Sequence, residues 1–274
     1  MARHFILNRN FILTSQTTIK PTNNGLLFGD CFSFVIRGCS SKMFFSKDFF
    51  DYLLKKVADF KMVLPIYYSQ TVFEGDIKNL LYVNRIYQGF EGIVSVYRNE
   101  NEKESSVLCS VEAIENQYYK YNKSGILLNS VSKETVPELL FKTKKYPFLN
   151  YFNNLENNLI LTDELGNIVQ VSNANIFFVR NNVIFVPKRQ LKNAELIIVK
   201  FVISLLKEKG YSIVSQNIKE EDLKSFDEVF VVSLRDGIKW VMGYKSVKRY
   251  YHNLSAEISS SMDEFLKKII ENGK

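Results

Sequence analysis

Apolar and polar residues in the first half of the chain follow two different periods. A spacing of about three to four residues predicts helices at 47–60 and 72–84, the first with an apolar stripe made of Phe49, Tyr52, Leu53 and Val57. Short apolar runs predict strands at residues 5–13, 26–38, 92–99 and 106–114, the last two forming a hairpin. Together these elements predict a smaller α+β domain over residues 1–115.

The second half shows another succession of strands and helices. Three short β runs within residues 158–187 are separated by the turn-forming segments ELGN, SNAN and RNN, and a further strand is predicted at 227–234. A helix is predicted at 191–210, with Gly210 as its C-terminal cap and with a stripe of Leu196, Val199, Val202 and Leu206. We expect a larger C-terminal domain over residues 126–274. The polar, tyrosine-rich residues 116–125 form the expected linker between the two domains.

Length and composition favour a folded protein that does not enter a membrane. The 274 residues are 46% hydrophobic, and no apolar run approaches the roughly 20 residues that span a bilayer. The first residues lack an apolar stretch followed by a cleavage site, so export is not expected. The cysteines Cys31, Cys39 and Cys109 lack a paired spacing, which favours a reducing compartment. The expected location is therefore the cytoplasm.

Charge and histidine content weaken several classes of function. The net charge is +7, but the basic residues are mixed with acidic ones, as in KEKGYSIVSQNIKEEDLK, so nucleic-acid binding is not expected. The only histidines are His4 and His252, which leaves little material for a Ser-His-Asp triad or a multi-histidine metal centre. No metal site is expected.

Five segments, taken in order, resemble the class IV pyridoxal-phosphate-dependent enzymes. This family contains the branched-chain aminotransferases, the D-amino-acid aminotransferases and the aminodeoxychorismate lyases. The segments are GLLFGD at 25–30 with the strand that follows it, LNYFNN at 149–154, DELGNI at 163–168, SNANIF at 172–177 and DLKSFDEVF at 222–230. The resemblance implies a two-domain α/β (α+β) fold, with a smaller N-terminal and a larger C-terminal domain. It also implies a homodimer, pyridoxal phosphate (PLP) bound between the domains, and a small amino or keto acid as substrate.

The cofactor lysine of the family has no direct counterpart in this chain. In the family it lies three or four residues before the position of Asn150, where this sequence has Pro147 and Tyr146. Lys145 is the nearest candidate for the Schiff-base lysine, and it reaches the same point only if a bulge at Pro147 absorbs the extra residue. Alternatively, Lys145 and its neighbouring lysines lie on a solvated strand or loop.

The other cofactor-binding positions of the family are also altered. Gln170 aligns with the glutamate that faces the pyridine nitrogen, and a neutral amide cannot pair with a pyridinium as a carboxylate does. Tyr52 aligns with a phosphate-binding arginine. The Gly-Ile-Thr segment at a helix start aligns with Asn193, Ala194 and Glu195, and the glutamate would repel a bound phosphate.

Three residues are candidates for compensating or conserved roles. Arg235 lies where the family has a small residue near the phosphate or substrate, and it either binds that group through a bidentate contact or is a surface residue. Phe32 and Arg37 match the family and are predicted to line a substrate pocket, although both also suit a core or an interface.

Two functions follow from these positions. The first is a class IV relative that keeps the fold but has a degenerate PLP site and impaired PLP chemistry. The second is an active aminotransferase or aminodeoxychorismate lyase that uses Lys145, with Arg37 or Arg235 holding a substrate carboxylate. We favour the first, because the lysine, acid, arginine and helix-start positions are all substituted.

Overall fold

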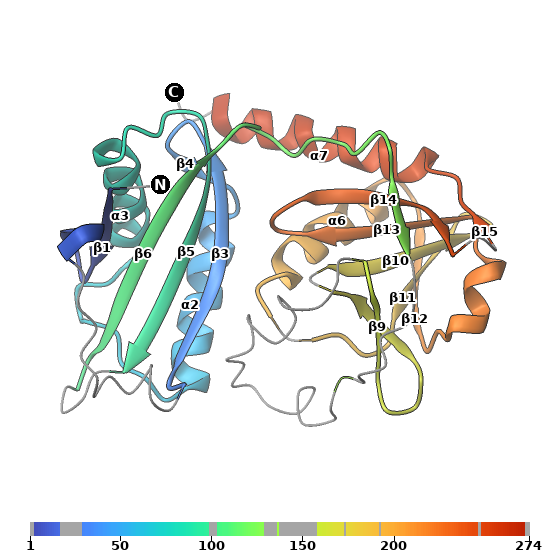
Figure 1. Ribbon diagram of the computed structural model, residues 1–274, viewed down its shortest axis with the longest axis horizontal. Helices are drawn as coiled ribbons and strands as arrows, with labels where there is room; N and C mark the ends of the chain where they lie inside the picture. The colour runs from blue at the N-terminus through green and yellow to red at the C-terminus, as the bar shows by residue number, and fades with distance from the viewer. Residues whose placement is uncertain are drawn as a thin grey trace. The chain divides into compact units, whose positions relative to one another are not determined.

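The computed structural model describes residues 3–16, 29–98, 103–128, 136, 158–172, 174–191, 193–245 and 248–271. These residues divide into two compact units. The described residues of the first unit are those up to Tyr118 and those from Leu266 onward, and the described residues of the second unit lie between Tyr119 and Phe265. Each unit has its own sheet (Figure 1).

The first unit is built on a six-stranded antiparallel sheet in the order β2-β1-β6-β5-β3-β4. The strands are β1 (His4–Leu7), β2 (Asn10–Leu13), β3 (Cys31–Cys39), β4 (Lys42–Met43), β5 (Gly89–Arg98) and β6 (Ser105–Ile114). A short 3-10 helix, η1 (Thr14–Gln16), follows β2. The predicted hairpin of residues 92–99 and 106–114 is confirmed, because β5 and β6 pair along their whole length.

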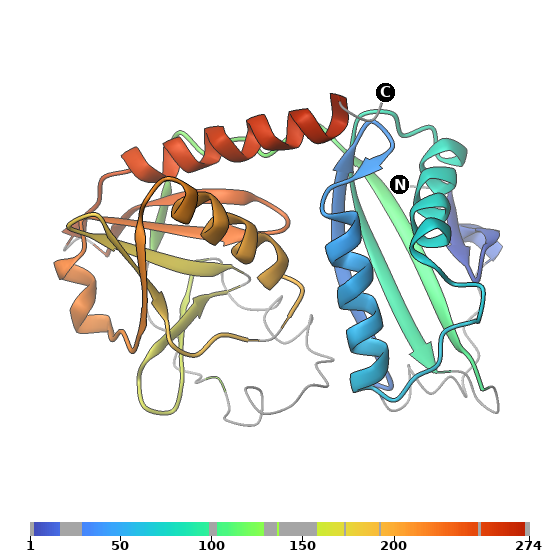
Figure 2. The ribbon, with the colours of Figure 1, turned by 180° about the vertical axis from the view of Figure 1, so that it is seen from behind.

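Two helices, α2 (Ser46–Asp59) and α3 (Gln70–Val83), cover one face of this sheet, as Figure 2 shows. Both confirm the helices predicted from the apolar spacing. Phe49, Leu53 and Val57 of α2 are buried, as the stripe predicts. Phe49 stacks on Phe34 of β3 with 5.7 Å between ring centroids. Burying an aromatic or branched side chain contributes roughly 1.5–3 kcal/mol, so this layer supplies much of the stability of the unit.

The second unit contains a larger mixed sheet in the order β12-β11-β10-β13-β14-β15, with β7 paired to β14 and a separate β8–β9 hairpin. Its first strands are β7 (Ile126–Leu128), β8 (Ile160–Thr162), β9 (Ile168–Val171), β10 (Asn175–Arg180) and β11 (Val183–Pro187). The others are β12 (Ser212–Gln216), β13 (Glu228–Ser233), β14 (Gly237–Tyr244) and β15 (Lys248–Arg249). The prediction of three β runs within 158–187 is therefore wrong: four strands form among the described residues of this range, because the ELGN turn separates β8 from β9.

The turn between β10 and β11 explains why this hairpin is tight. Asn181 and Asn182 both have positive φ values, 51° and 60°. A two-residue loop with positive φ at both positions matches the twist of the flanking strands, and asparagine tolerates this conformation better than most residues. The RNN segment therefore predicts the turn through local chemistry alone.

The second unit also contains the helix α6 (Leu196–Glu208), the 3-10 helix η2 (Glu220–Ser225) and the part of α7 (Asn253–Glu271) up to Phe265. The predicted helix at 191–210 is confirmed as α6, and Gly210 ends it with φ +84°. Its buried stripe contains Ile198, Val199, Val202 and Leu206, so the predicted place of Leu196 on that stripe is wrong. Leu196 is the first helical residue and is only half-buried. The boundary between the units falls within α7, after Phe265.

Candidate functional site

The predicted site residues are distributed over both units. Phe32, Arg37 and Tyr52 belong to the first unit; Gln170, Asn193, Ala194 and Arg235 belong to the second. Lys145 lies outside the described residues, so its assignment as the Schiff-base lysine stays a prediction. The clearest arrangement of polar groups is in the second unit, where α6 begins beside the end of β13.

The turn that follows β13 is held on both sides of Leu234. The backbone N–H of Leu234 donates to Oε2 of Glu195 at 2.6 Å, and its carbonyl accepts from the hydroxyl of Tyr119 at 2.8 Å. Gly237 ends the turn with φ +72°, and a Cβ there would lie 2.6 Å from the ring of Tyr119. Because both backbone groups of Leu234 have side-chain partners, the turn has a defined position next to α6. Arg235 is exposed in this turn, and its contact with a phosphate or substrate stays a prediction.

The start of α6 uses its own backbone donors. The N–H of Leu196 bonds to the carbonyl of Asn193 at 3.3 Å, and the N–H of Ile197 bonds to that of Ala194 at 2.9 Å. The first N–H groups of a helix normally lack intrahelical partners and are the groups that attract an anion. Two of these donors are therefore engaged in the local turn.

Acceptor groups gather at the same helix start. Glu195 is the N-cap residue of α6, but its side chain makes no capping hydrogen bond and instead reaches Leu234. The side-chain oxygen Oδ1 of Asn193 is buried without a hydrogen-bond partner. A carboxylate and an amide oxygen both accept hydrogen bonds, as phosphate oxygens do. This helix start therefore offers fewer donors to an anion than an ordinary helix N-terminus does.

Gln170 lies in β9 and is only 4% exposed. Its Nε2 amide donates to the carbonyl oxygen of Ser172 in the turn that leads to β10. Asn175 begins β10 and pairs with Val232 near the end of β13. The turn after Gln170 thus leads to the end of the sheet at which strand β13 ends and helix α6 begins.

A buried carboxylate supports the segment that precedes α6. Asp163, at the tip of the β8–β9 hairpin, is fully buried and accepts from the backbone N–H of Leu165 and from the backbone and side-chain N–H groups of Asn167. Nη1 of Arg189 lies 3.4 Å from its Oδ2. Burial alone raises the pKa of Asp163, but these hydrogen bonds outweigh it and hold the pKa below the usual range. The ionised carboxylate therefore connects the hairpin to residues just before α6.

In the first unit, Tyr52 and Phe32 lie in the layer between helix and sheet. The ring of Tyr52 meets Phe34 edge-on at 5.4 Å, and Nζ of Lys56 lies 5.6 Å from the centre of the Tyr52 ring. Phe32 is 3% exposed and packs on Phe60 with 5.2 Å between ring centroids. Burial lowers the pKa of Lys56. These contacts place Phe32 in the hydrophobic core of the unit and Tyr52, which is half-buried, against it.

Arg37 is on the opposite face of β3 from Phe32, because the two positions are five residues apart on one strand. The residue is 7% exposed, and Nη2 of its guanidinium donates to the backbone carbonyls of Asn116 at 3.4 Å and Tyr118 at 3.1 Å. Arg37 therefore supports the segment that follows β6. The roles of Phe32 and Arg37 in substrate binding stay predictions.

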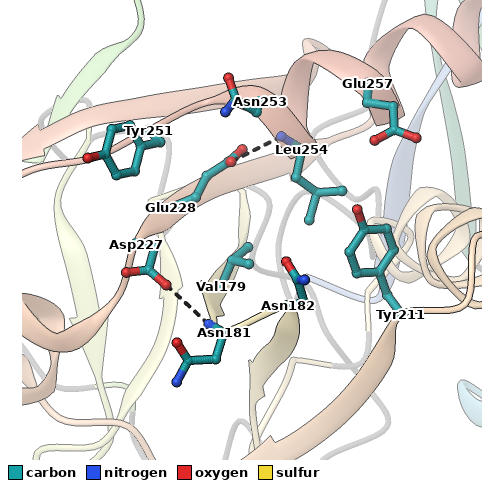
Figure 3. Close-up of a pocket in the computed structure, with 10 residues that line it drawn as sticks. All are labelled: Val179, Asn181, Asn182, Tyr211, Asp227, Glu228, Tyr251, Asn253, Leu254 and Glu257. Atoms are coloured by element: carbon teal, nitrogen blue, oxygen red, sulfur yellow. Dashed lines mark hydrogen bonds between the residues drawn. The ribbon is translucent and has the colours of Figure 1, made fainter.

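A small pocket in the second unit lies at the other end of β13. Its volume is about 260 Å³. Figure 3 shows the side chains that line it, which come from the β10–β11 turn, the approach to β12, the start of β13 and the start of α7. Strand β13 advances about 3.3 Å per residue, so Glu228 at the pocket and Leu234 at α6 are about 20 Å apart along the strand. The pocket is therefore separate from the start of α6.

The carboxylates in this pocket have structural partners. Oε2 and Oε1 of Glu228 accept from the N–H groups of Leu254 at 3.0 Å and Ser255 at 2.6 Å, which caps α7 (Figure 3 draws the first bond). Asp227 accepts from the N–H of Asn181 at 3.1 Å. Glu228 is 5% exposed, so its charge is compensated mainly by the helix start. Glu228 therefore anchors the start of α7, and Asp227 anchors the β10–β11 turn.

Other kinds of site are not found among the described residues. No three His, Cys, Asp or Glu side chains there come together as a possible metal-binding group. Within the same part of the chain, no helix is both long and apolar enough to cross a membrane.

Glu195, Leu234 and Tyr119 complete the arrangement around α6, and sequence patterns identified only the first of them. Glu195 stands out because a negative charge falls at an expected phosphate position. Tyr119 lies in the predicted linker, yet it is 2% exposed and bonds to Leu234, which is 115 residues away. A tyrosine with a buried hydroxyl needs a hydrogen-bond partner, but the sequence does not indicate which one.

Comparison with known proteins identifies a family and a fold. The family model described as amino-transferase class IV matches residues 40–234. No curated protein matches the sequence. Among solved structures, a branched-chain aminotransferase from Thermoproteus uzoniensis with norvaline is 16% identical. It aligns over 97% of this chain and 95% of that chain with a TM-score of 0.80.

Two further structures give the same result. A T.th. branched-chain amino acid aminotransferase with pyridoxamine 5′-phosphate is 16% identical over 97% of this chain and 94% of that chain, with a TM-score of 0.81. The Escherichia coli branched-chain amino acid aminotransferase is 15% identical over 95% of this chain and 93% of that chain, with a TM-score of 0.77. Likeness at this level of identity shows the fold alone. It confirms the predicted class IV aminotransferase-like α/β fold.

Proposed function

This chain belongs to the class IV aminotransferase family, and from that premise we propose that it keeps the family fold but is impaired in PLP chemistry. The family cofactor is PLP, and a related structure contains pyridoxamine 5′-phosphate. The residues of this chain at the positions that contact the cofactor in the family differ in chemical type from those the cofactor needs.

The observation that carries the proposal is that the side chain of Gln170 is uncharged and is already hydrogen-bonded within the protein. When PLP is bound, its pyridine ring acts as an electron sink, and a carboxylate against the ring nitrogen keeps that nitrogen protonated. Gln170 is a neutral amide, and its Nε2 group donates to the carbonyl of Ser172. A buried amide engaged with its own backbone cannot supply the negative charge that stabilises a pyridinium. Gln170 therefore does not fit the role of the family's acid.

Tyr52 and the start of α6 support the same conclusion. Tyr52 stands at the arginine position, but its ring is packed against Phe34, and a phenol carries no positive charge at neutral pH. At the start of α6, Asn193 and Glu195 supply acceptors where a phosphate requires donors. These residues therefore support a site that does not fit PLP at the ring nitrogen or at the phosphate, and no reaction step through the cofactor follows from them.

Titration with PLP tests the proposal. The purified chain is titrated while visible absorbance is followed, then reduced with borohydride, and the modified lysines are mapped by mass spectrometry. We expect no saturable change in absorbance and only scattered, weak lysine modification. A control in the same experiment is the Lys144→Ala variant, which removes one lysine of the same run.

The opposite outcome would identify the second function, an active aminotransferase or lyase acting on a small amino or keto acid. In that case a saturable adduct would be trapped at Lys145, lost in Lys145→Ala and kept in Lys144→Ala. Such a result would replace the proposal and justify a screen of amino donors. The homodimer and the cytoplasmic location stay predictions, and sedimentation of the purified chain would test the first.

A further inference from the structure

The carboxylate of Glu195 binds the backbone N–H of Leu234 as an anionic ligand would. A carboxylate oxygen lies 2.6 Å from the backbone nitrogen of Leu234, next to the first residue of α6. Charge-assisted hydrogen bonds to an anion typically span about 2.7–2.9 Å, so this N–H already has a strong acceptor. A ligand oxygen that needs the same N–H would have to displace the carboxylate.

The local conformation explains why the carboxylate occupies this position. Glu195 is in helical conformation, with φ −55° and ψ −25°, and its side chain does not cap the helix to which it belongs. The side chain instead extends to the turn after β13, where Tyr119 holds the carbonyl of Leu234. Because α6 and β13 are in one compact unit, the contact does not depend on how the two units are arranged.

The neighbouring groups also disfavour a second anion. The N–H groups of Leu196 and Ile197 are bonded to the carbonyls of Asn193 and Ala194. The buried Oδ1 of Asn193 is a further acceptor without a hydrogen-bond partner. A phosphate at this helix start would meet one negative charge and one unshared lone pair where it needs donors.

We propose that Glu195 is a built-in anion that takes the place of a ligand phosphate between the start of α6 and Leu234. The inference rests on the proposed function, because it names the residue that closes the phosphate end of the site. It goes further in stating the ligand class: this end of the site accepts a group without phosphate, either neutral or able to donate hydrogen bonds. It also names Glu195 as the side chain that occupies the N–H of Leu234 in place of a phosphate oxygen.

Two substitutions of Glu195 test this inference. Glu195→Gln removes the charge but keeps an oxygen that can accept from Leu234, so it preserves the local structure. Glu195→Thr removes the charge and opens the space in front of the N–H. The matched control is Glu208→Gln, which removes the same charge from the last residue of the same helix, about 20 Å away at ~1.5 Å per residue. Far-ultraviolet circular dichroism identifies any variant that does not fold.

The readout is binding of inorganic phosphate, measured by calorimetry, together with the affinity ratio of PLP to pyridoxal, which lacks the phosphate. We expect no saturable phosphate binding by the wild-type chain or by Glu208→Gln, and a PLP to pyridoxal ratio near one for both. Glu195→Thr should bind phosphate at least about tenfold more tightly than the wild type, with a smaller gain for Glu195→Gln.

The two proposals fail in different ways. If neither Glu195 variant binds phosphate more tightly than the wild type, or if Glu208→Gln gains as much as they do, the built-in anion is wrong and the proposed function stands. If the wild-type chain forms a saturable adduct at Lys145, the proposed function is wrong. If the wild type itself binds inorganic phosphate as tightly as Glu195→Thr, the claim that Glu195 blocks phosphate at the start of α6 is wrong. Should Glu195→Thr fail to fold, the comparison of Glu195→Gln with Glu208→Gln decides.

Discussion

Both ends of β13 carry a hydrogen bond between a glutamate carboxylate and backbone N–H groups next to a helix start. At the beginning of the strand, Glu228 accepts from the N–H groups of Leu254 and Ser255 at the start of α7. At its end, Glu195 from the start of α6 accepts from the N–H of Leu234. In the first case a side chain of the strand accepts from the free N–H groups of the helix. In the second a side chain of the helix accepts from an N–H group of the turn after the strand.

The comparison shows that the position of the carboxylate decides its effect. A carboxylate supplied from outside a helix takes up the free N–H groups, which stabilises α7 and anchors it to the sheet. A carboxylate that belongs to the helix start leaves those N–H groups to the local turn and adds negative charge where an anion would bind. The same chemical pair therefore builds structure at one end of β13 and closes a binding position at the other.

Removing the carboxylate of Glu228 should have the largest effect on stability. Glu228→Ala loses two charge-assisted hydrogen bonds at a site that is 5% exposed, so the free energy of unfolding should fall by about 3 kcal/mol. Urea denaturation followed by circular dichroism measures this change. Glu257→Ala is the control on the same helix: Glu257 is half-exposed and pairs with Lys209 at the surface, so little change is expected. Equal losses in the two variants would mean that Glu228 does not act as a cap.

Removing the carboxylate of Glu195 should cost less. Glu195→Ala loses the hydrogen bond to Leu234 at a half-buried position, which predicts a loss of about 1 kcal/mol. Tyr119→Phe removes the other side-chain bond to Leu234 and should cost a similar amount, about 1 kcal/mol. A double-mutant cycle should give a coupling of at least ~0.5 kcal/mol, because both bonds hold one turn. Strict additivity would indicate that they act independently.

Asp163 should have the smallest effect, and the effect should depend on pH. Its pKa is lowered in the folded state, so the native chain binds fewer protons than the unfolded chain near pH 4. The stabilisation is present above the ordinary pKa of an aspartate, about 3.9, and is lost as the pH falls through the lowered value. Asp163→Asn should therefore be less stable than the wild type at pH 7, with the difference shrinking below about pH 4.

Denaturation of both proteins between pH 7 and pH 3 measures this dependence. Asp51→Asn is a suitable control, since Asp51 is an exposed aspartate within α2. A difference between wild type and Asp163→Asn that stays constant over this range would show that the hydrogen bonds of Asp163 do not favour its ionised form.

Several elements were predictable because their signals are local. The helices α2, α3 and α6, the β5–β6 hairpin and the cap at Gly210 all follow from apolar spacing and turn residues within a short window. Helix α7 could have been found in the same way. Its buried apolar residues recur every fourth position, at Leu254, Ile258, Met262, Leu266 and Ile270. Polar serines between these positions obscured the pattern.

The composition of the candidate site was only partly predictable. Substitutions at the positions of Gln170, Tyr52 and Glu195 are visible in the sequence, because short segments around them resemble the family. The present partners of these side chains are not visible there. Gln170 bonds to a carbonyl two residues away, which a turn allows but does not require. Glu195 bonds to an amide 39 residues away, and its partner depends on how α6 lies against β13.

The sequence by itself determined the periodic elements, the tight turns, the family likeness and the chemical type of each substituted residue. These properties depend on the residues within one element or one short segment. Only the tertiary structure decided that the Glu195 carboxylate reaches Leu234, that Tyr119 holds the same turn and that Glu228 caps α7. The physical reason is that a hydrogen bond forms wherever folding brings a donor and an acceptor within about 3 Å, and that distance is set by packing of the whole unit.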